Sequence, residues 1–261
     1  MKLVKFALRR EDSQPRWGIL AEDGKITALE GTPFFAITPT AEYFFLDEVH
    51  LLAPEEATKI VAVGKNYADH AKEMASDVPT TPVLFLKPST AVNHPDAPIP
   101  LYRPLTGRVD YEGELAFVIS KKARRVQAAD FADYILGYTC LNDVTARALQ
   151  SFDGQWTRGK SLDLFAPMGP FLETEFDPSD ALLETRLNGK LVQQGRTSSM
   201  LFPVPELLAF ITAHMTLLPG DVVTTGTPAG IGPMADGDIV EVFIEGIGTL
   251  RNVADSREIG G

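Results

Sequence analysis

The chain has 261 residues, of which 44% are hydrophobic, and it carries a formal net charge of −11. This length suits one large domain or one domain with a small appendage, and the apolar fraction is too high for a disordered chain. The acidic balance argues against a nucleic-acid or anionic-membrane partner, either of which would require a basic face. A single cysteine, Cys140, excludes an internal disulfide and a cysteine-based zinc site. No apolar run is long enough to cross a membrane and the start shows no secretory leader pattern, so we expect a soluble cytoplasmic protein.

The N-terminal part of the chain predicts a small β-rich unit. Residues 2–8, 16–20 and 25–29 are strand-like, and Asp23-Gly24 predicts a hairpin turn before the third of them. Pro54-Glu55-Glu56 marks a boundary, because the pattern of a new buried strand follows it. The sequence therefore predicts an N-terminal domain over 1–55 and a second domain over 56–261.

The second unit begins with a buried strand over 59–64 and continues with short strands and few helices. A helix over 66–74, capped by Asn66, follows the first strand. Seven prolines between 79 and 104 then predict an extended loop with brief strands. Two further helices are expected, one opening at Asn142-Asp143 and one at Pro205 with proline in its first turn.

Two glutamates on one strand are the most informative feature of the chain. Glu112 and Glu114 stand near the start of the strand-like segment 110–119, and side chains at i and i+2 of a strand point to the same face. Like charges side by side are unfavourable on a sheet unless a cation neutralises them, although a solvated face is the ordinary reading of Glu-x-Glu. Asp143, after the strand over 134–141, is either a helix N-cap or a third ligand. An oxygen-only set suits Mg²⁺ or Mn²⁺, or Ca²⁺, rather than zinc.

Further polar residues allow a catalytic and an ordinary reading. His70 and Glu73 are three residues apart on a predicted helix, so they form either a carboxylate-oriented general base or an exposed pair. Arg147 and Gln150 fall at i+4 and i+7 from Asp143, along one face of the helix expected there.

Two later segments also carry candidate binding groups. Lys160 is either an anion-binding lysine or a surface one. The glycine-rich stretch over 226–232 lacks the ending of a nucleotide loop, and it predicts a tight turn whose backbone amides or Thr227 hold a carboxylate.

Taken together, these segments resemble the fumarylacetoacetate hydrolase superfamily from about residue 60 to about residue 253. The motifs that carry the resemblance are, in chain order, Gly64-Lys65-Asn66-Tyr67-Ala68-Asp69-His70, Phe85-Leu86-Lys87-Pro88-Ser89, Asp110-Tyr111-Glu112-Gly113-Glu114, Asn142-Asp143-Val144-Thr145-Ala146-Arg147, Lys160-Ser161, Leu187-Asn188-Gly189, Thr197-Ser198-Ser199-Met200 and Gly220-Asp221-Val222-Val223-Thr224-Thr225-Gly226-Thr227-Pro228.

The resemblance implies a β-rich α+β fold, in which a layered mixed-sheet catalytic domain of β-roll or sandwich type follows a small N-terminal domain. It implies a homodimer or a dimer of dimers that acts on a small oxo acid. It also implies Mg²⁺ or Mn²⁺ held by Glu112, Glu114 and Asp143. Lys65 departs from the superfamily pattern, where an arginine is common, and we expect no catalytic role for it.

The same resemblance assigns roles to the remaining candidates. It implies that His70 and Glu73 form a water-activating pair on a lid over the substrate. It implies that Lys160, Arg147 and Gln150 contact the substrate or the enolate that it becomes, with Lys160 in a catalytic role. Thr227 matches a carboxylate-binding position.

These assignments predict a metal-dependent hydrolase that cleaves a carbon–carbon bond in a 2,4-dioxo acid of acylpyruvate or fumarylpyruvate type, as in aromatic catabolism. The metal would stabilise an enolate, and the His70–Glu73 pair would deprotonate the attacking water, a contribution typically worth about 10²–10⁴-fold.

Other reactions share these motifs. The alternatives are a decarboxylase of oxaloacetate or of 5-oxopent-3-ene-1,2,5-tricarboxylate, and an isomerase of 2-hydroxyhepta-2,4-diene-1,7-dioate in which the pair shuttles a proton between carbons. A remote alternative is a non-catalytic metal-binding protein. Residues 75–82 and 101–108 are expected to determine which substrate length and charge are accepted. Arg103 and Arg108 are candidates for holding a second carboxylate.

Overall fold

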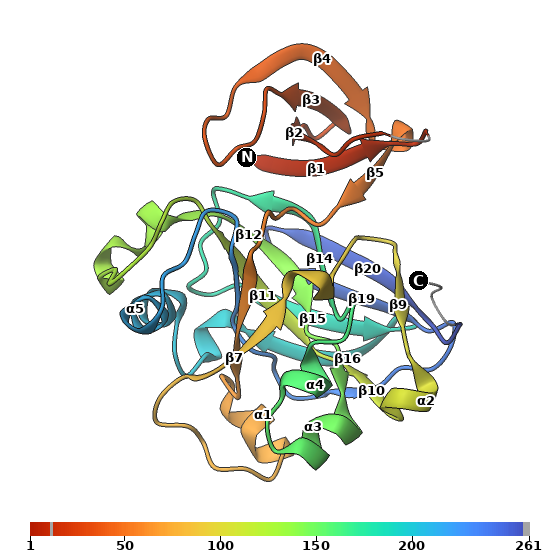
Figure 1. Ribbon diagram of the computed structural model, residues 1–261, viewed down its shortest axis with the longest axis vertical. Coiled ribbons are helices and arrows are strands. Elements are labelled where there is room, and N and C mark those ends of the chain that lie inside the picture. The colour runs from red at the N-terminus through yellow and green to blue at the C-terminus, as the bar shows by residue number, and fades with distance from the viewer. Residues whose placement is uncertain (11–12, 258–261) are drawn as a thin grey trace.

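A computed structural model describes residues 1–10 and 13–257 of the chain and is built mainly of β-strands (Figure 1). Within these residues the strands gather into three sheets of twelve, five and three strands. The β-rich α+β architecture expected from the sequence is confirmed. None of the helices in the described ranges has the length and apolar character needed to cross a bilayer.

The largest sheet contains, in the order in which neighbours pair, β4 (Pro39–Phe45), β3 (Lys25–Leu29), β2 (Arg16–Leu20), β1 (Lys2–Leu8), β14 (Ala166–Glu173), β12 (Ile135–Asn142), β11 (Gly113–Ile119), β17 (Val222–Thr224), β6 (Lys59–Gly64) and β7 (Val83–Pro88). Off this path, β5 (Val49–Leu52) pairs with β1, and β8 (Val92–Asn93) pairs with β14.

The five-stranded sheet has the order β16 (Lys190–Arg196), β15 (Leu182–Leu187), β19 (Ile239–Ile244), β20 (Gly248–Asp255) and β9 (Pro98–Pro100), and the smallest sheet has β13 (Thr145–Ala146), β10 (Val109–Tyr111) and β18 (Gly232–Pro233). The helices are α1 (Ala68–Glu73), α2 (Arg103–Thr106), α3 (Arg147–Asp153), α4 (Thr157–Lys160) and α5 (Val204–His214), with short 3₁₀ turns at Leu46–Glu48, Ser89–Ala91, Ala128–Tyr134 and Thr197–Ser199.

Strand β11 lies at the centre of the molecule, and every one of its residues is buried. Leu115 and Phe117 belong to a core cluster that also contains Leu183 of the five-stranded sheet. Ala116 and Val118 point to the opposite face and join a second cluster beneath the large sheet. Burial on both faces explains why this strand is apolar without alternation.

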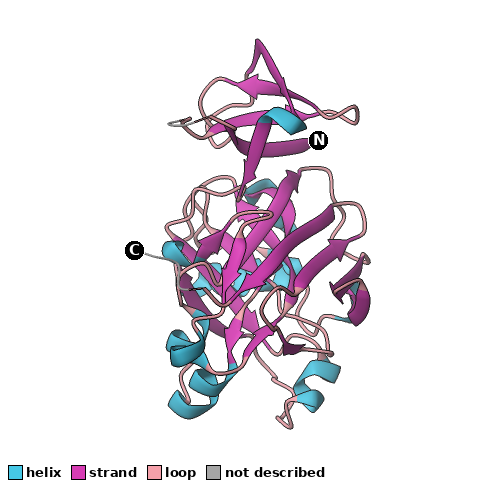
Figure 2. Cartoon of the chain, turned by 90° about the vertical axis from the view of Figure 1, so that its right-hand side faces the viewer, coloured by secondary structure: helices cyan, strands magenta, loops and turns pink. Residues whose placement is uncertain are grey.

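The N-terminal strands form a lobe at one end of the molecule (Figures 1 and 2). The three strands predicted there are confirmed with the expected bounds, and Gly24 supplies the positive φ of +83° in the hairpin turn. β4 and β5 were not foreseen. The large sheet continues from this lobe into the rest of the chain, because Leu3 of β1 pairs with Leu172 of β14. The division at residue 55 stays a prediction.

The predicted cap at Asn66 is wrong. Helix α1 begins at Ala68, and its N-cap residue is Tyr67. The Asn66 side chain is fully buried, and its amide donates to the carbonyls of Thr225, at 2.8 Å, and Phe202, at 3.0 Å. Asn66 therefore joins distant segments instead of capping the helix beside it.

The helix expected at Asn142-Asp143 also begins elsewhere. Strand β12 runs through Asn142, Thr145 and Ala146 pair with β10, and α3 starts only at Arg147. Asp143 is consequently not a helix cap and does not share a helix with Arg147. By contrast, α5 has the predicted proline in its first turn.

Asp221 joins the start of β17 to the start of its parallel neighbour β6. Its fully buried carboxylate accepts hydrogen bonds from the Thr58 hydroxyl at 2.7 Å, the Leu218 N–H at 2.9 Å and the Lys59 ammonium. Although burial raises the pKa of Asp221, the hydrogen bonds from Lys59, Leu218 and Thr58 lower it overall. The carboxylate therefore stabilises the fold in its ionised form.

Asp221→Asn should lower the free energy of unfolding by about 3 kcal/mol, because an amide nitrogen would face donors that now contact a carboxylate. Urea unfolding at pH 7 measures this loss. Since the pKa is lowered in the folded protein, the contribution is present above the unfolded value of about 3.9 and is lost as the pH falls through the folded value. The difference in free energy of unfolding between variant and parent should become smaller over that pH range.

Asp96→Asn is the matched control, because Asp96 forms an exposed pair with Arg251 at 3.2 Å. Its urea midpoint should equal that of the parent. Equal midpoints for all three proteins would contradict the role given to Asp221.

Candidate active site

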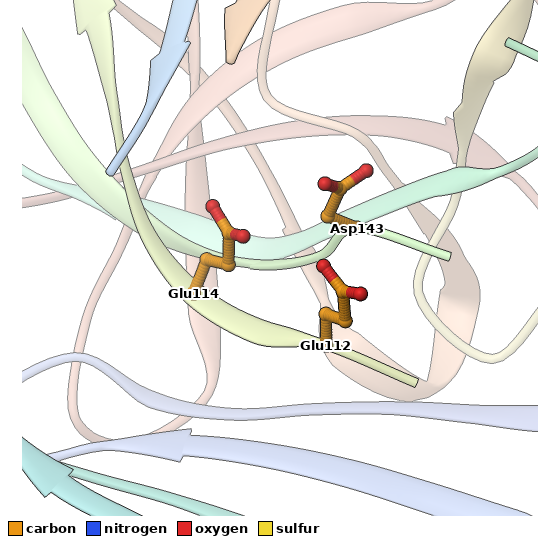
Figure 3. A group of neighbouring side chains, drawn as sticks. All are labelled: Glu112, Glu114 and Asp143. Carbon is orange, nitrogen blue, oxygen red and sulfur yellow. The ribbon is translucent and has the colours of Figure 1, made fainter. Parts of the chain in front are cut away.

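Three carboxylates meet where β11 begins and β12 ends (Figure 3). Glu112, Glu114 and Asp143 are at most 4% exposed, and one oxygen from each lies within 4.8 Å of the others. The antiparallel register sets Gly113 opposite Asn142, which brings Asp143 beside Glu112, and the Asp143 N–H donates to the Glu112 carbonyl at 2.8 Å. The predicted convergence of these three side chains is therefore present.

Buried cations surround the carboxylates. The Lys160 ammonium lies 2.7 Å from Glu112 Oε2 and 2.6 Å from Asp143 Oδ2, while the Lys87 ammonium lies 2.6 Å from Asp143 Oδ1. Arg147 donates to the second oxygen of Glu112. These contacts compensate Glu112 and Asp143 much better than Glu114.

The pKa values reflect this uneven compensation. Burial raises the pKa of Glu112, but Lys160 and Arg147 lower it overall to about 2. Glu114 accepts a hydrogen bond from the Thr224 hydroxyl and one from a backbone N–H, yet burial and the charge of Asp143 raise its pKa well above the usual range. A divalent cation would favour the ionised form of Glu114, and the oxygen-only donor set fits Mg²⁺ or Mn²⁺.

His70 and Glu73 of α1 lie beside these carboxylates. His70 Nδ1 is 3.3 Å from Glu73 Oε2, and His70 is only 6% exposed. Both oxygens of Glu73 accept the Gly230 N–H at 3.1 Å, which ties α1 to the loop over 226–232. His70 is therefore buried at the site, whereas Glu73 stays exposed to solvent at the edge of α1.

All of the predicted site residues except Glu73 line one pocket. It is lined by Val63, Gly64, Lys65, His70, Met74, Phe85, Glu112, Glu114, Asp143, Arg147, Gln150, Trp156, Lys160 and Thr227. Residues 75–82 and 101–108 do not line it. Arg103 donates instead to the Met234 carbonyl and Arg108 to Asp110, so the expectation that these segments read the substrate is not supported.

Arg147 and Gln150 reach the pocket from α3. Arg147 Nη1 donates to Gln150 Oε1 at 2.6 Å, and Arg147 Nε donates to the buried Asp110 at 2.9 Å. The surface reading of Lys160 is wrong, because this residue is 2% exposed at the end of α4. Gly159 precedes it where a Cβ would collide with the backbone of Gln150, so α3 and α4 pack closely enough to bury the lysine.

The loop over 226–232 holds carboxylates, but they belong to the protein. The Gly226 N–H donates to Glu114 at 2.8 Å, and the Gly230 N–H donates to Glu73. The Thr227 hydroxyl donates to the Gly113 carbonyl at 2.9 Å and accepts a hydrogen bond from Gln193 at 2.8 Å. In this arrangement the Thr227 hydroxyl proton is directed to the main chain and not to a ligand.

Sequence reasoning missed three residues that support the site. Lys87 is a fully buried lysine on β7, Asp110 orients Arg147, and Gln193 reaches from β16 to Thr227. A lysine between apolar residues of a strand was the available signal for Lys87. Asp110 stands in one of the motifs that carry the resemblance but was given no role there, and Gln193 carried no local signal, because its partner is distant in sequence.

Glu114→Ala should weaken Mn²⁺ binding by at least about tenfold, because one of three ligands is lost and the remaining two stay paired with Lys160 and Arg147. Calorimetric titration of the metal-free protein with Mn²⁺ measures the change. Asp163→Asn is the control, since Asp163 is exposed and lies outside the triad. Unchanged Mn²⁺ affinity in the Glu114 variant would contradict the ligand assignment.

Comparison with known proteins places this geometry in a family. The model described as Fumarylacetoacetate (FAA) hydrolase C-terminal matches residues 59–254, and the model described as Rv2993c-like, N-terminal matches residues 1–54. Protein Rv2993c of Mycobacterium tuberculosis is 50% identical over 240 residues, which are 90% of each chain.

Two relatives carry names that describe an activity. Oxaloacetate tautomerase YisK of Bacillus subtilis is 42% identical over 224 residues, covering 80% of this chain and 74% of that protein. The crystal structure of 5-carboxymethyl-2-hydroxymuconate delta-isomerase from Mycobacterium smegmatis superimposes with a TM-score of 0.91 at 44% identity, over 98% of this chain and 100% of that one. The family match over most of the chain agrees with the motifs and with the fold. The chain belongs to the fumarylacetoacetate hydrolase family.

Proposed function

We propose that the chain is a divalent-metal-dependent enzyme that moves a proton at the carbon beside the carbonyl of a 2-oxo acid, interconverting its enol and keto forms. The observation that carries this proposal is the position of His70, which lines the same pocket as the three carboxylates and contacts Glu73. The names of two relatives support it, because a tautomerase and a delta-isomerase both relocate a proton without consuming water.

Glu112, Glu114 and Asp143 are the residues that would hold Mg²⁺ or Mn²⁺. When bound there, the ion supplies Lewis-acid stabilisation for negative charge on a substrate oxygen. Lys160 and Arg147 add cationic donors at the same place, and Asp110 and Gln150 hold the Arg147 side chain in position.

His70 is the proton carrier in this proposal. Its Nδ1 contacts Glu73, which leaves Nε2 to take a proton from one atom of the substrate and return it to another. Glu73 stabilises the imidazolium that forms in between, and the Gly230 N–H fixes Glu73. No water is consumed, because the proton removed from one atom of the substrate returns to another atom of the same molecule.

Aromatic side chains form one wall of the pocket. Phe85 and Trp156 pack with ring centroids 5.3 Å apart, and Trp156 lies so close to Gly64 that a Cβ there would collide with it. This side of the pocket is therefore apolar, opposite in character to the carboxylates and cations that line the rest of it.

Hydrolysis of a 2,4-dioxo acid is the second candidate. The same His70–Glu73 pair could deprotonate a water molecule, and the same carboxylates would hold the metal. The two reactions differ in whether a carbon–carbon bond breaks, so product analysis separates them.

A product panel tests the proposal directly. Enol-oxaloacetate, acetylpyruvate and fumarylpyruvate are incubated with the protein and Mg²⁺ or Mn²⁺. We expect faster loss of the enol absorbance of oxaloacetate, with neither carbon dioxide nor pyruvate formed above the protein-free rate, and we expect a chelator to abolish the effect. Release of pyruvate from acetylpyruvate or fumarylpyruvate would instead establish the hydrolase.

His70→Asn should lower kcat for enol-oxaloacetate by about 10²-fold or more, because the proton carrier is removed. Its Mn²⁺ affinity should equal that of the parent, since His70 is not among the three ligands. His214→Asn, on the exposed end of α5, should change neither value. A parent-like kcat in the His70 variant would refute the proton-carrier role.

A further inference from the structure

Lys65 occupies an unusual place at the pocket. It follows β6 directly, lines the pocket and has a left-handed backbone with φ of +57°. Glycine and asparagine adopt this conformation more readily than lysine, so the backbone geometry does not call for a lysine. The chemistry of the side chain is therefore the better explanation for this residue.

The other cations at the site already have partners. Lys160 contacts Glu112 and Asp143, and Arg147 contacts Glu112 and a buried aspartate. Lys87, behind the pocket, contacts Asp143. Among the described residues Lys65 takes part in no ion pair and no side-chain hydrogen bond, so its charge is available to a ligand.

The charges of the site show what such a ligand would be. Lys87, Lys160 and Arg147 are each held by carboxylates of the protein, so none of them is free to pair with a second carboxylate of a substrate. A second carboxylate on the substrate would be buried without compensation, which is costly unless one more cation lies nearby. Lys65 is that cation.

We propose that Lys65 binds the carboxylate remote from the 2-oxo group, so that the pocket selects dicarboxylic over monocarboxylic 2-oxo acids. The inference rests on the proposed function, which supplies the 2-oxo acid. It makes Lys65 a specificity-determining residue that takes no part in proton transfer.

Binding of an unreactive ligand pair tests the inference apart from turnover. Malate and 2-hydroxybutanoate differ only in that a methyl group replaces the remote carboxylate. Calorimetry with the Mg²⁺-loaded protein should show at least tenfold tighter binding of malate. In Lys65→Asn, whose side chain suits the left-handed backbone, malate should lose that advantage while 2-hydroxybutanoate changes less than twofold.

Kinetics with oxaloacetate give a second readout. Lys65→Asn should raise KM at least tenfold and change kcat less than threefold, and Lys65→Arg should restore most of the affinity. Lys72→Met removes a lysine that pairs with Asp69 on the exposed side of α1, and it should leave KM unchanged.

Two results would overturn the inference. Equal affinity of the parent protein for malate and 2-hydroxybutanoate would show that no remote carboxylate is recognised. An equal loss for both ligands in Lys65→Asn would show that the residue only shapes the loop. A preference for malate that depends on Lys65, in a protein that does not turn over oxaloacetate, would uphold the inference and refute the proposed function.

Discussion

The structure depends on the burial of several carboxylates at one point, where β11 begins and β12 ends. Glu112, Glu114 and Asp143 are almost completely removed from water, and ionised groups are tolerated there only with cations or hydrogen-bond donors beside them. The chain supplies those partners from three separate elements, namely β7, α3 and α4. The position of these elements is therefore set by charge compensation as well as by apolar packing.

This cluster is connected to the rest of the fold through the segment that follows β17. Glu114 accepts a hydrogen bond from the Gly226 N–H, and four residues later the Gly230 N–H holds Glu73. At the other end of β17, Asp221 fixes the parallel neighbour β6, which leads directly to Lys65 and α1. One continuous stretch thus positions a candidate metal ligand, the partner of the histidine and the start of the strand that reaches the pocket.

Strand alternation made part of this site predictable. Glu112 and Glu114 converge because their spacing matches the period of a strand, and the N-terminal strands have short-range apolar patterns that fix their bounds. The positions of Asn66 and Asp143 could not be predicted from the neighbouring sequence. A residue type that favours a helix cap can also hydrogen-bond to distant backbone, as Asn66 does, or follow a strand, as Asp143 does. The burial of Lys160 could not be predicted either, because it results from the packing of α4 against α3.

The arrangement separates the choice of substrate from the choice of reaction. In the proposed reaction, the metal ligands and His70 act on the bond next to the carbonyl, whichever acid is bound. Access of water to the reacting carbon would decide between proton relocation and hydrolysis. We infer that substrate charge, by contrast, is sensed at Lys65, which has no ion-pair partner among the described residues. In this proposal a change of reaction needs no new metal ligands, and a change of substrate needs no new proton carrier.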